Sequence, residues 1–259
     1  MTSLLYVFWK SRSPSVFLLV AILQINALSA FQTPLRFKPR SIAPASPTAL
    51  LESPLSLDNS LTTLIAFFPT RGFEQQQNVV NTFKTALIPR LVQEPGFVSC
   101  HIHTSLDGSR VALYEQWNSL EDCYRSYGSE SMATAVRRSL KYVLEVDDDS
   151  VDRHVYEIVG SAGAPVVDRP EAPFVQFAEF PTAEETQQGL LEFAWDHLLQ
   201  SQPRPWTAAI HRSIDGAKVV NYAQWNDENG IHSEKAYWDG VTENEHRLYH
   251  LVSSHERGQ

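Results

Sequence analysis

An asparagine and a tryptophan, Asn221 and Trp225, lie four residues apart in the segment Lys218–Trp225, which reads KVVNYAQW. This segment is predicted to be a strand, and because side chains alternate along a strand, the two residues share one face. An amide can hold a phenolic oxygen or a peroxide, and an indole can stack on an aromatic ring while offering an N–H. An unpaired buried amide would cost about 1 to 3 kcal/mol, so we expect water or a ligand to meet Asn221.

Two histidines are candidates for a proton acceptor beside this pair. His211 lies on the neighbouring strand of the same predicted hairpin, and His232 follows Trp225 by seven residues in a helical region. Imidazole titrates near neutral pH and can therefore act as a general base. Each also has a structural alternative, because His211 could bond the hairpin turn and His232 could face solvent on a helix. His246, near the C-terminus, is expected at the surface.

The segment that holds Asn221 occurs twice. Residues 103–118 read HTSLDGSRVALYEQWN, and residues 211–226 read HRSIDGAKVVNYAQWN. The shared His, Ser, Asp-Gly, Val, Tyr and Gln-Trp-Asn positions indicate that one fold unit has been duplicated. Leu113 stands in copy one where Asn221 stands in copy two, so the site beside Trp117 is expected to be degenerate or altered.

Each copy shows the same order of predicted elements. A strand ending in Phe-Pro-Thr is followed by an amphipathic helix, a hairpin with an Asp-Gly turn, a second helical region and a last apolar strand. The predicted strands are 61–68, 97–104, 110–117 and 154–159 in copy one, and 174–180, 206–213, 218–225 and 247–252 in copy two. The order β-α-β-β-α-β is ferredoxin-like, and the sheet face without helices needs a cover. We therefore predict an α+β protein in which two tandem units pair sheet to sheet.

The N-terminal segment has the composition of a targeting sequence. The first 51 residues contain no Asp or Glu, and the apolar run Val16–Ile25 suits a signal peptide better than a membrane span of roughly 20 residues. Ser29-Ala30-Phe31 and the following basic, Ser- and Pro-rich stretch resemble the bipartite plastid presequences of algae with secondary plastids. We expect delivery to a plastid, with secretion or an endomembrane lumen as the alternative. The predicted division is 1–30 signal peptide, 31–58 transit-like segment, 59–160 first domain, 161–173 linker, 174–254 second domain and 255–259 tail.

Charge and cysteine content exclude several classes of protein. Five of the 21 Lys and Arg residues lie in the presequence, which leaves 16 against 30 Asp and Glu. Such an acidic chain is poorly suited to nucleic acid or an anionic membrane, and no integral span is expected after processing. Two cysteines do not make a disulfide framework, and no Cys/His spacing indicates a structural zinc site.

The copy-two motif HRSIDGAKVVNYAQW resembles the antibiotic-biosynthesis monooxygenase family of the dimeric α+β barrel superfamily, and the copy-one segment DRHVYEIVG resembles the family's last strand. The resemblance covers roughly residues 61 to 254. It implies two tandem ferredoxin-like β-α-β-β-α-β units forming an intramolecular dimeric α+β barrel. It also implies a cavity between sheet and helices, lined by the Asn221 and Trp225 pair, and a monooxygenase that needs no metal or flavin cofactor.

The expected substrate is an aromatic, phenolic or quinol-type small molecule. Asn221 would orient its oxygen, Trp225 would stack on its ring, and His211 or His232 would take a proton. Trp117 and Trp195 are candidate substrate contacts, although for Trp117 a place in the core is the favoured interpretation. One alternative is a non-catalytic barrel that binds a hydrophobic ligand or a partner. Another is a haem-binding or haem-degrading protein with His232 as axial ligand. The chain could be a monomer with an internal pseudo-dimer or a homodimer.

Overall fold

The computed structural model describes residues 60–130, 132, 134, 136, 150–162, 174–200, 205–225, 231 and 244–256. All of them belong to one unit of the chain, Thr48–Gln259. The predicted presequence, most of the predicted linker and His232 lie outside these residues. Within them, no helix is long and apolar enough to cross a bilayer.

The described residues form eight strands and five helical segments. The strands are β1 (Thr62–Pro69), β2 (Phe97–Ser105), β3 (Arg110–Trp117), β4 (Asp152–Ala162), β5 (Phe174–Pro181), β6 (Thr207–Ser213), β7 (Lys218–Trp225) and β8 (Glu245–Glu256). The helical segments are α2 (Phe73–Thr82), the π-helix η2 (Phe83–Leu87), α3 (Ile88–Leu91), α4 (Leu120–Gly128) and α6 (Glu184–Gln200). Every strand overlaps a predicted one, because period-two alternation and the Asp-Gly turns are strong local signals.

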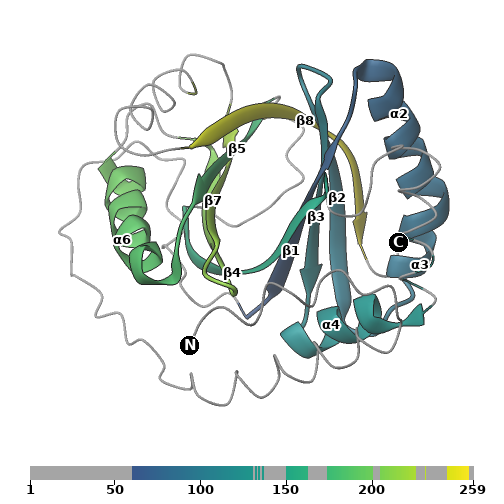
Figure 1. Ribbon diagram of the computed structural model, residues 1–259, viewed down its shortest axis with the longest axis horizontal. Helices are drawn as coiled ribbons and strands as arrows, with labels where there is room; N and C mark the ends of the chain where they lie inside the picture. The colour runs from purple at the N-terminus through teal and green to yellow at the C-terminus, as the bar shows by residue number, and fades with distance from the viewer. Residues whose placement is uncertain are drawn as a thin grey trace. The chain divides into compact units, whose positions relative to one another are not determined.

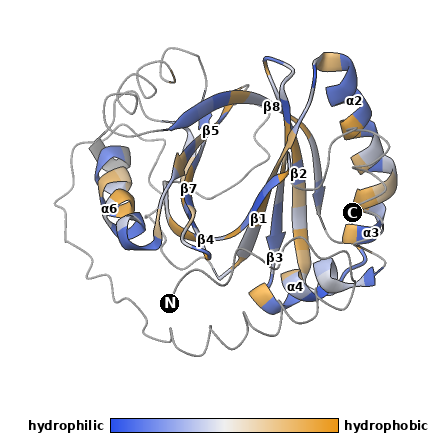
Figure 2. Cartoon of the chain, viewed as in Figure 1, coloured by the Kyte–Doolittle hydropathy of each residue, from blue (hydrophilic) through white to orange (hydrophobic). Residues whose placement is uncertain are grey.

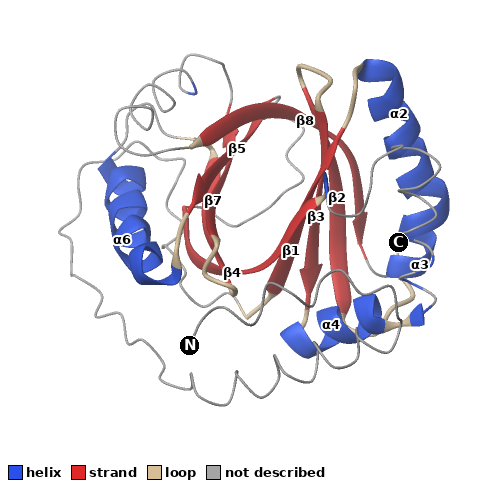
Figure 3. Ribbon diagram, in the orientation of Figure 1, coloured by secondary structure: helices blue, strands red, loops and turns tan. Residues whose placement is uncertain are grey.

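The strands close into one antiparallel barrel in the order β1-β3-β2-β8-β5-β7-β6-β4 (Figure 1). Copy one supplies the sheet β4-β1-β3-β2 and copy two the equivalent sheet β8-β5-β7-β6. The helices lie outside the barrel, with α2 and α4 against the copy-one sheet and α6 against the copy-two sheet (Figure 3). The predicted fold class, two tandem ferredoxin-like units forming an intramolecular dimeric α+β barrel, is confirmed.

The last strand of each copy joins the two sheets. The first part of β4 pairs with β1 of its own copy, and the part from Tyr156 to Ala162 pairs with β6 of the other. Likewise β8 pairs with β5 up to Tyr249 and with β2 beyond it. This closure leaves the barrel without an unpaired edge. It also explains why β4 and β8 run two residues past the expected domain ends at 160 and 254, since each needs length for a second partner.

Each sheet buries both of its faces. Side chains inside the barrel form one apolar cluster, including Tyr114, Phe177 and Tyr222. The opposite faces form two further clusters beneath the helices, one in each copy. Hydrophilic and hydrophobic residues both occur along the strands and the helices (Figure 2). A residue's parity along its strand therefore decides whether it faces the barrel interior or a helix.

The repeated histidine and tyrosine connect the two copies inside the barrel. The Tyr114 hydroxyl lies 2.9 Å from Nε2 of His211, and the Tyr222 hydroxyl lies 3.4 Å from Nε2 of His103. Each tyrosine thus meets the histidine of the other copy. Burial lowers the pKa of His211 to about 4 and that of His103 to about 3, so both rings are neutral at physiological pH. These identities between the copies serve the barrel interface.

A second set of cross-copy contacts joins each hairpin turn to the other copy's last strand. Arg247 Nη1 lies 2.8 Å from Asp107, and in the equivalent place His154 Nδ1 lies 2.6 Å from Asp215. Burial disfavours protonated His154, but hydrogen bonds to Asp152 and Asp215 outweigh it and raise the pKa to about 9. His154 is therefore a cation at neutral pH, in the role that arginine has on the other side.

We expect this histidine to make stability depend on pH. The pKa of His154 is raised above its unfolded value of 6.5, so its contribution is complete below pH 6.5 and is lost as pH rises through about 9. In His154→Arg the cation persists, and the free energy of unfolding measured in urea should fall less between pH 6.5 and 9.5 than in the wild type. Arg247→His is the matched control. It places a second titrating histidine in the equivalent position, so the free energy of unfolding should show an additional fall of similar size over the same pH range. Equal pH profiles for the wild type and His154→Arg would contradict the assignment.

Candidate functional site

The predicted pair lies on the helix-facing side of the copy-two sheet. Ala178 on β5 is in register with Asn221 on β7 and with His246 on β8, so these three residues form a row across neighbouring strands. Trp225, four residues after Asn221, is on the same face, and its register partner is Phe174. The structure therefore brings Asn221 and Trp225 together as the sequence predicts.

Asn221 is buried, with only 4% of its surface exposed. Its Oδ1 has no hydrogen-bond partner among the residues that the structure describes. Its strand neighbours are Ala178 and Ile210, whose side chains are apolar. A buried unpaired amide oxygen is costly, so the geometry favours a polar group that meets Asn221 from a ligand, from water or from outside the described residues.

Trp225 is held by a hydrogen bond that the sequence did not reveal. Its Nε1 donates to Oε1 of Gln176 at 2.9 Å, and Nε2 of Gln176 lies 2.8 Å from Nδ1 of His246. Gln176 is fully buried. The indole N–H is therefore engaged within the protein, contrary to the expectation that it would be offered to a substrate. His246 is half-buried at this site and not a surface residue.

At four positions the helix-facing side of copy two carries smaller side chains than that of copy one. Equivalent positions in the two copies follow from the strand registers and from one helix glutamine that both copies share. This residue, Gln76 in copy one and Gln187 in copy two, bonds the hairpin of its own copy in the same way. The pairs, copy one first, are Phe83 and Ala194, Cys100 and Ala208, Leu113 and Asn221, and Glu115 and Ala223. At these four positions copy one fills the space under its helices with side chains that copy two does not have.

Trp195 bounds the cluster around Asn221 and Trp225 on the side next to β4. It comes from α6 and packs against the backbone of Gly160, where an added Cβ would lie only 2.0 Å from Cζ3 of the indole. Gly160 is in register with Ile210, the strand neighbour of Asn221. Trp195 therefore belongs to the same cluster as Asn221 and Trp225, at a place where it could contact a ligand.

Other predicted site residues are not brought to this place. His211 is in register with Val220, whose side chain faces the barrel interior, so His211 lies on the opposite face of the sheet from Asn221. Trp117 is fully buried in copy one, 5.5 Å from the ring of Phe97, which fits the core alternative. His232 lies outside the described residues, so neither its predicted role as a base nor haem ligation by it is tested.

Copy one has a buried acid where copy two has Ala223. Glu115 accepts a 2.6 Å hydrogen bond from the hydroxyl of Tyr127 and a 3.1 Å bond from Nε1 of Trp117. Burial raises the pKa of Glu115 to about 7, although these two donors and Arg153 oppose the shift. The sequence interpretation passed over this residue because a single Glu in an apolar strand has no local signature.

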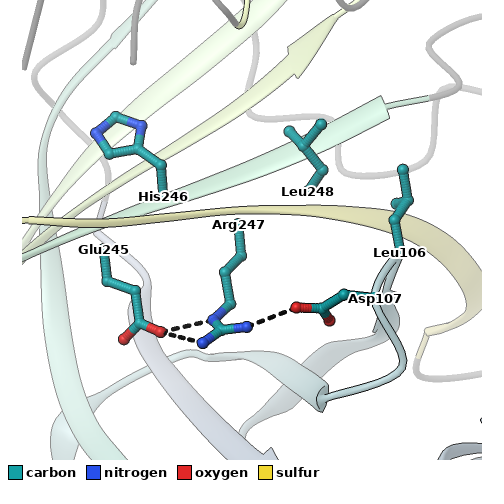
Figure 4. Close-up of a pocket in the computed structure, with 6 residues that line it drawn as sticks. All are labelled: Leu106, Asp107, Glu245, His246, Arg247 and Leu248. Carbon is teal, nitrogen blue, oxygen red and sulfur yellow. Dashed lines mark hydrogen bonds and ion pairs between the residues drawn. The ribbon is translucent and has the colours of Figure 1, made fainter. Parts of the chain in front are cut away.

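A pocket of about 350 Å³ lies between the β2–β3 hairpin and the first residues of β8 (Figure 4). It is lined by Leu106, Asp107, Glu245, His246, Arg247 and Leu248. Arg247 lies between Glu245 and Asp107 and bonds both, so its charge is compensated, while His246 lies on the other side of β8 (Figure 4). Among the described residues, no group of three His, Cys, Asp or Glu is placed to hold a metal ion.

Comparison with known proteins identifies relatives by structure. No family model matches the sequence, and no curated protein is detectably similar to it. An anthrone oxidase-like protein has a TM-score of 0.64 and 19% identity, over 80% of this chain and 98% of that one. A protein of Fusobacterium nucleatum with a provisional assignment as a monooxygenase has a TM-score of 0.56 and 8% identity, over 76% and 95%. These likenesses show the fold, and at that level they confirm the resemblance: the chain is a tandem dimeric α+β barrel.

Proposed function

We propose that the helix-facing site of copy two binds a small aromatic molecule of phenolic, quinol or anthrone type and oxidises it with molecular oxygen. The observation that carries the proposal is the buried amide oxygen of Asn221, without a partner among the described residues and on one face with the Trp225 ring. The four positions at which copy two has smaller side chains than copy one support it, because they lie on the same face. The name of the similar anthrone oxidase-like structure suggests the substrate class.

The chemistry uses the substrate as the reductant. Loss of a proton from an anthrone methylene leaves an electron-rich anion, which transfers electrons to oxygen so that a carbon–oxygen bond forms. The hydroperoxide then loses water, which leaves a carbonyl on the ring. One oxygen atom enters the quinone and the other enters water, so neither metal nor flavin is required. The protein supplies orientation and a site shielded from water.

The residues have separate roles in this reaction. Oδ1 of Asn221 accepts a hydrogen bond from a hydroxyl of the substrate, the Trp225 face stacks on its ring, and Trp195 bounds the site next to β4. His211 is on the opposite face, so of the two histidines predicted as proton acceptors only His232 keeps that proposed role.

Oxygen uptake with anthrone or a hydroquinone tests the proposal. Ala194→Phe restores the copy-one side chain at this place and should abolish uptake and quinone formation by filling the space beside Trp225. The matched control is Glu192→Phe, which puts the same side chain on the exposed face of α6 and should leave uptake unchanged. Ligand binding without oxygen uptake would instead identify a non-catalytic binding barrel. Equal uptake in Ala194→Phe and the wild type would place the reaction elsewhere.

A further inference from the structure

A chain of two hydrogen bonds runs from Trp225 through Gln176 to His246. An indole nitrogen can only donate, so the 2.9 Å contact requires the carbonyl oxygen of Gln176 to face Trp225. The NH₂ group of Gln176 must then face His246. Since NH₂ can only donate, Nδ1 of His246, 2.8 Å away, must be an acceptor without a proton. The tryptophan thus determines the orientation of the amide, and the amide determines the state of the imidazole.

We propose that Trp225 and Gln176 hold His246 as a neutral imidazole with its proton on Nε2, and that this N–H donates to an oxygen anion of the ligand, a phenolate or enolate. The identity of the ligand rests on the proposed function, whereas the tautomer of His246 does not. Protonation of Nδ1 would set it against the NH₂ group of Gln176. Reversing the amide would set that same group against the indole N–H. Either change leaves two buried donors facing each other.

The position of His246 suits contact with the same ligand as Asn221. Both are register partners of Ala178, one on each side, so their backbones are about 10 Å apart across three strands. The residue between them, Ala178, has a small side chain, so it does not separate the two polar groups. The ring of Phe180 packs at 5.9 Å and at right angles to the imidazole, which restricts its rotation. An aromatic ring with oxygen substituents is of the size that would fit between the two polar groups.

A neutral donor suits a reaction in which the substrate is the reductant. The anion must persist long enough to reduce oxygen, and an imidazolium could return a proton to it. A neutral N–H stabilises the negative charge but has little tendency to give up its proton. His246 would therefore act as a substrate-binding donor and not as a base.

Copy one lacks this arrangement. Leu64 stands where Gln176 does, and the indole of Trp117 bonds Glu115 instead. The register partner of Ala66 on β4 is Arg153, where His246 partners Ala178 in copy two. Among the described residues, these hydrogen bonds therefore occur in copy two, where the oxygen of Asn221 has no partner, and not in copy one.

Nitrogen-15 NMR of histidine-labelled protein tests the tautomer without any substrate. The wild type should show His246 as the Nε2–H form at pH 7.5. In Gln176→Glu the carboxylate can accept from both neighbours, so Nδ1 of His246 should gain a proton, while the exposed His250 should keep its wild-type signals. Trp225→Phe frees the amide to rotate and should give both tautomers. An Nδ1–H form or an imidazolium in the wild type would overturn the proposal.

The ligand contact is tested with para-nitrophenol, whose absorbance distinguishes phenol from phenolate. Wild-type protein should bind the phenolate at least tenfold more tightly than the phenol, as a charged hydrogen bond allows. His246→Leu should lose this preference, and His246→Gln should recover part of it through its amide N–H. Absence of any preference in the wild type would overturn the donor role. If the wild type prefers the phenolate but shows no oxygen uptake, only the proposed function is overturned.

Discussion

Replacing Asn221 with leucine, the residue that copy one carries at this position, is expected to lower oxygen-dependent turnover about 100-fold, as removal of one positioned polar group does in other enzymes. The same change should leave stability equal or raise it by about 1 kcal/mol, because it removes a buried amide oxygen that has no partner among the described residues. Oxygen-electrode kinetics and urea unfolding measure the two effects. A loss of activity without a loss of stability separates function from packing.

The reciprocal change, Leu113→Asn, is the matched control. It puts an amide at the equivalent place in copy one, where the surrounding side chains are larger and Leu113 is 1% exposed. We expect it to destabilise the protein by about 1 to 3 kcal/mol and to leave turnover unchanged. If Asn221→Leu destabilised the protein as Leu113→Asn does, Asn221 would be a structural residue with a partner of its own.

Replacing Glu115 with glutamine is expected to stabilise the protein at alkaline pH. Burial raises the pKa of Glu115 from the ordinary 4.5 to about 7, so the folded state retains a proton that the unfolded state has released. Stability therefore falls as pH rises from 4.5 to 7, and above that the charged acid remains buried at a cost of about 3 kcal/mol. Glutamine keeps the shape, can accept from Trp117 and donate to the Tyr127 hydroxyl, and does not titrate.

Urea unfolding of the wild type and Glu115→Gln between pH 4.5 and 8.5 measures this effect. The difference between the two should be small at pH 4.5 and reach about 2 to 3 kcal/mol in favour of Glu115→Gln at pH 8. Because other groups titrate alike in both proteins, the difference isolates this side chain. A difference that does not change with pH would show that Glu115 is ionised throughout, stabilised by its two hydrogen-bond donors and Arg153.

The two copies thus represent two uses of one fold unit. In copy one the space under the helices is filled by Phe83, Leu113 and Glu115, and the indole of Trp117 is bonded within the core. In copy two the corresponding side chains are smaller and the polar groups of Asn221, Gln176 and His246 gather on the same face. The barrel interior, by contrast, is alike in both, because each copy needs the other's histidine and tyrosine there.

By itself, the sequence determined the duplication, the strands, the Asp-Gly hairpins and the shared face of Asn221 and Trp225. All of these depend on residues within a few positions of each other, where period-two alternation and turn chemistry are decisive. It also indicated the site through one difference between the copies, Leu113 against Asn221.

Only the tertiary structure decided that His211 faces the barrel interior and meets Tyr114, and that Gln176 and His246 join Trp225. Gln176 and His246 are 70 residues apart, and their contact depends on β5 pairing with both β7 and β8. Local patterns show which face a side chain takes relative to its neighbours in the chain, but not whether that face meets a helix or the other sheet. That choice is made by barrel closure, which buries both faces and requires a partner for each polar group on them.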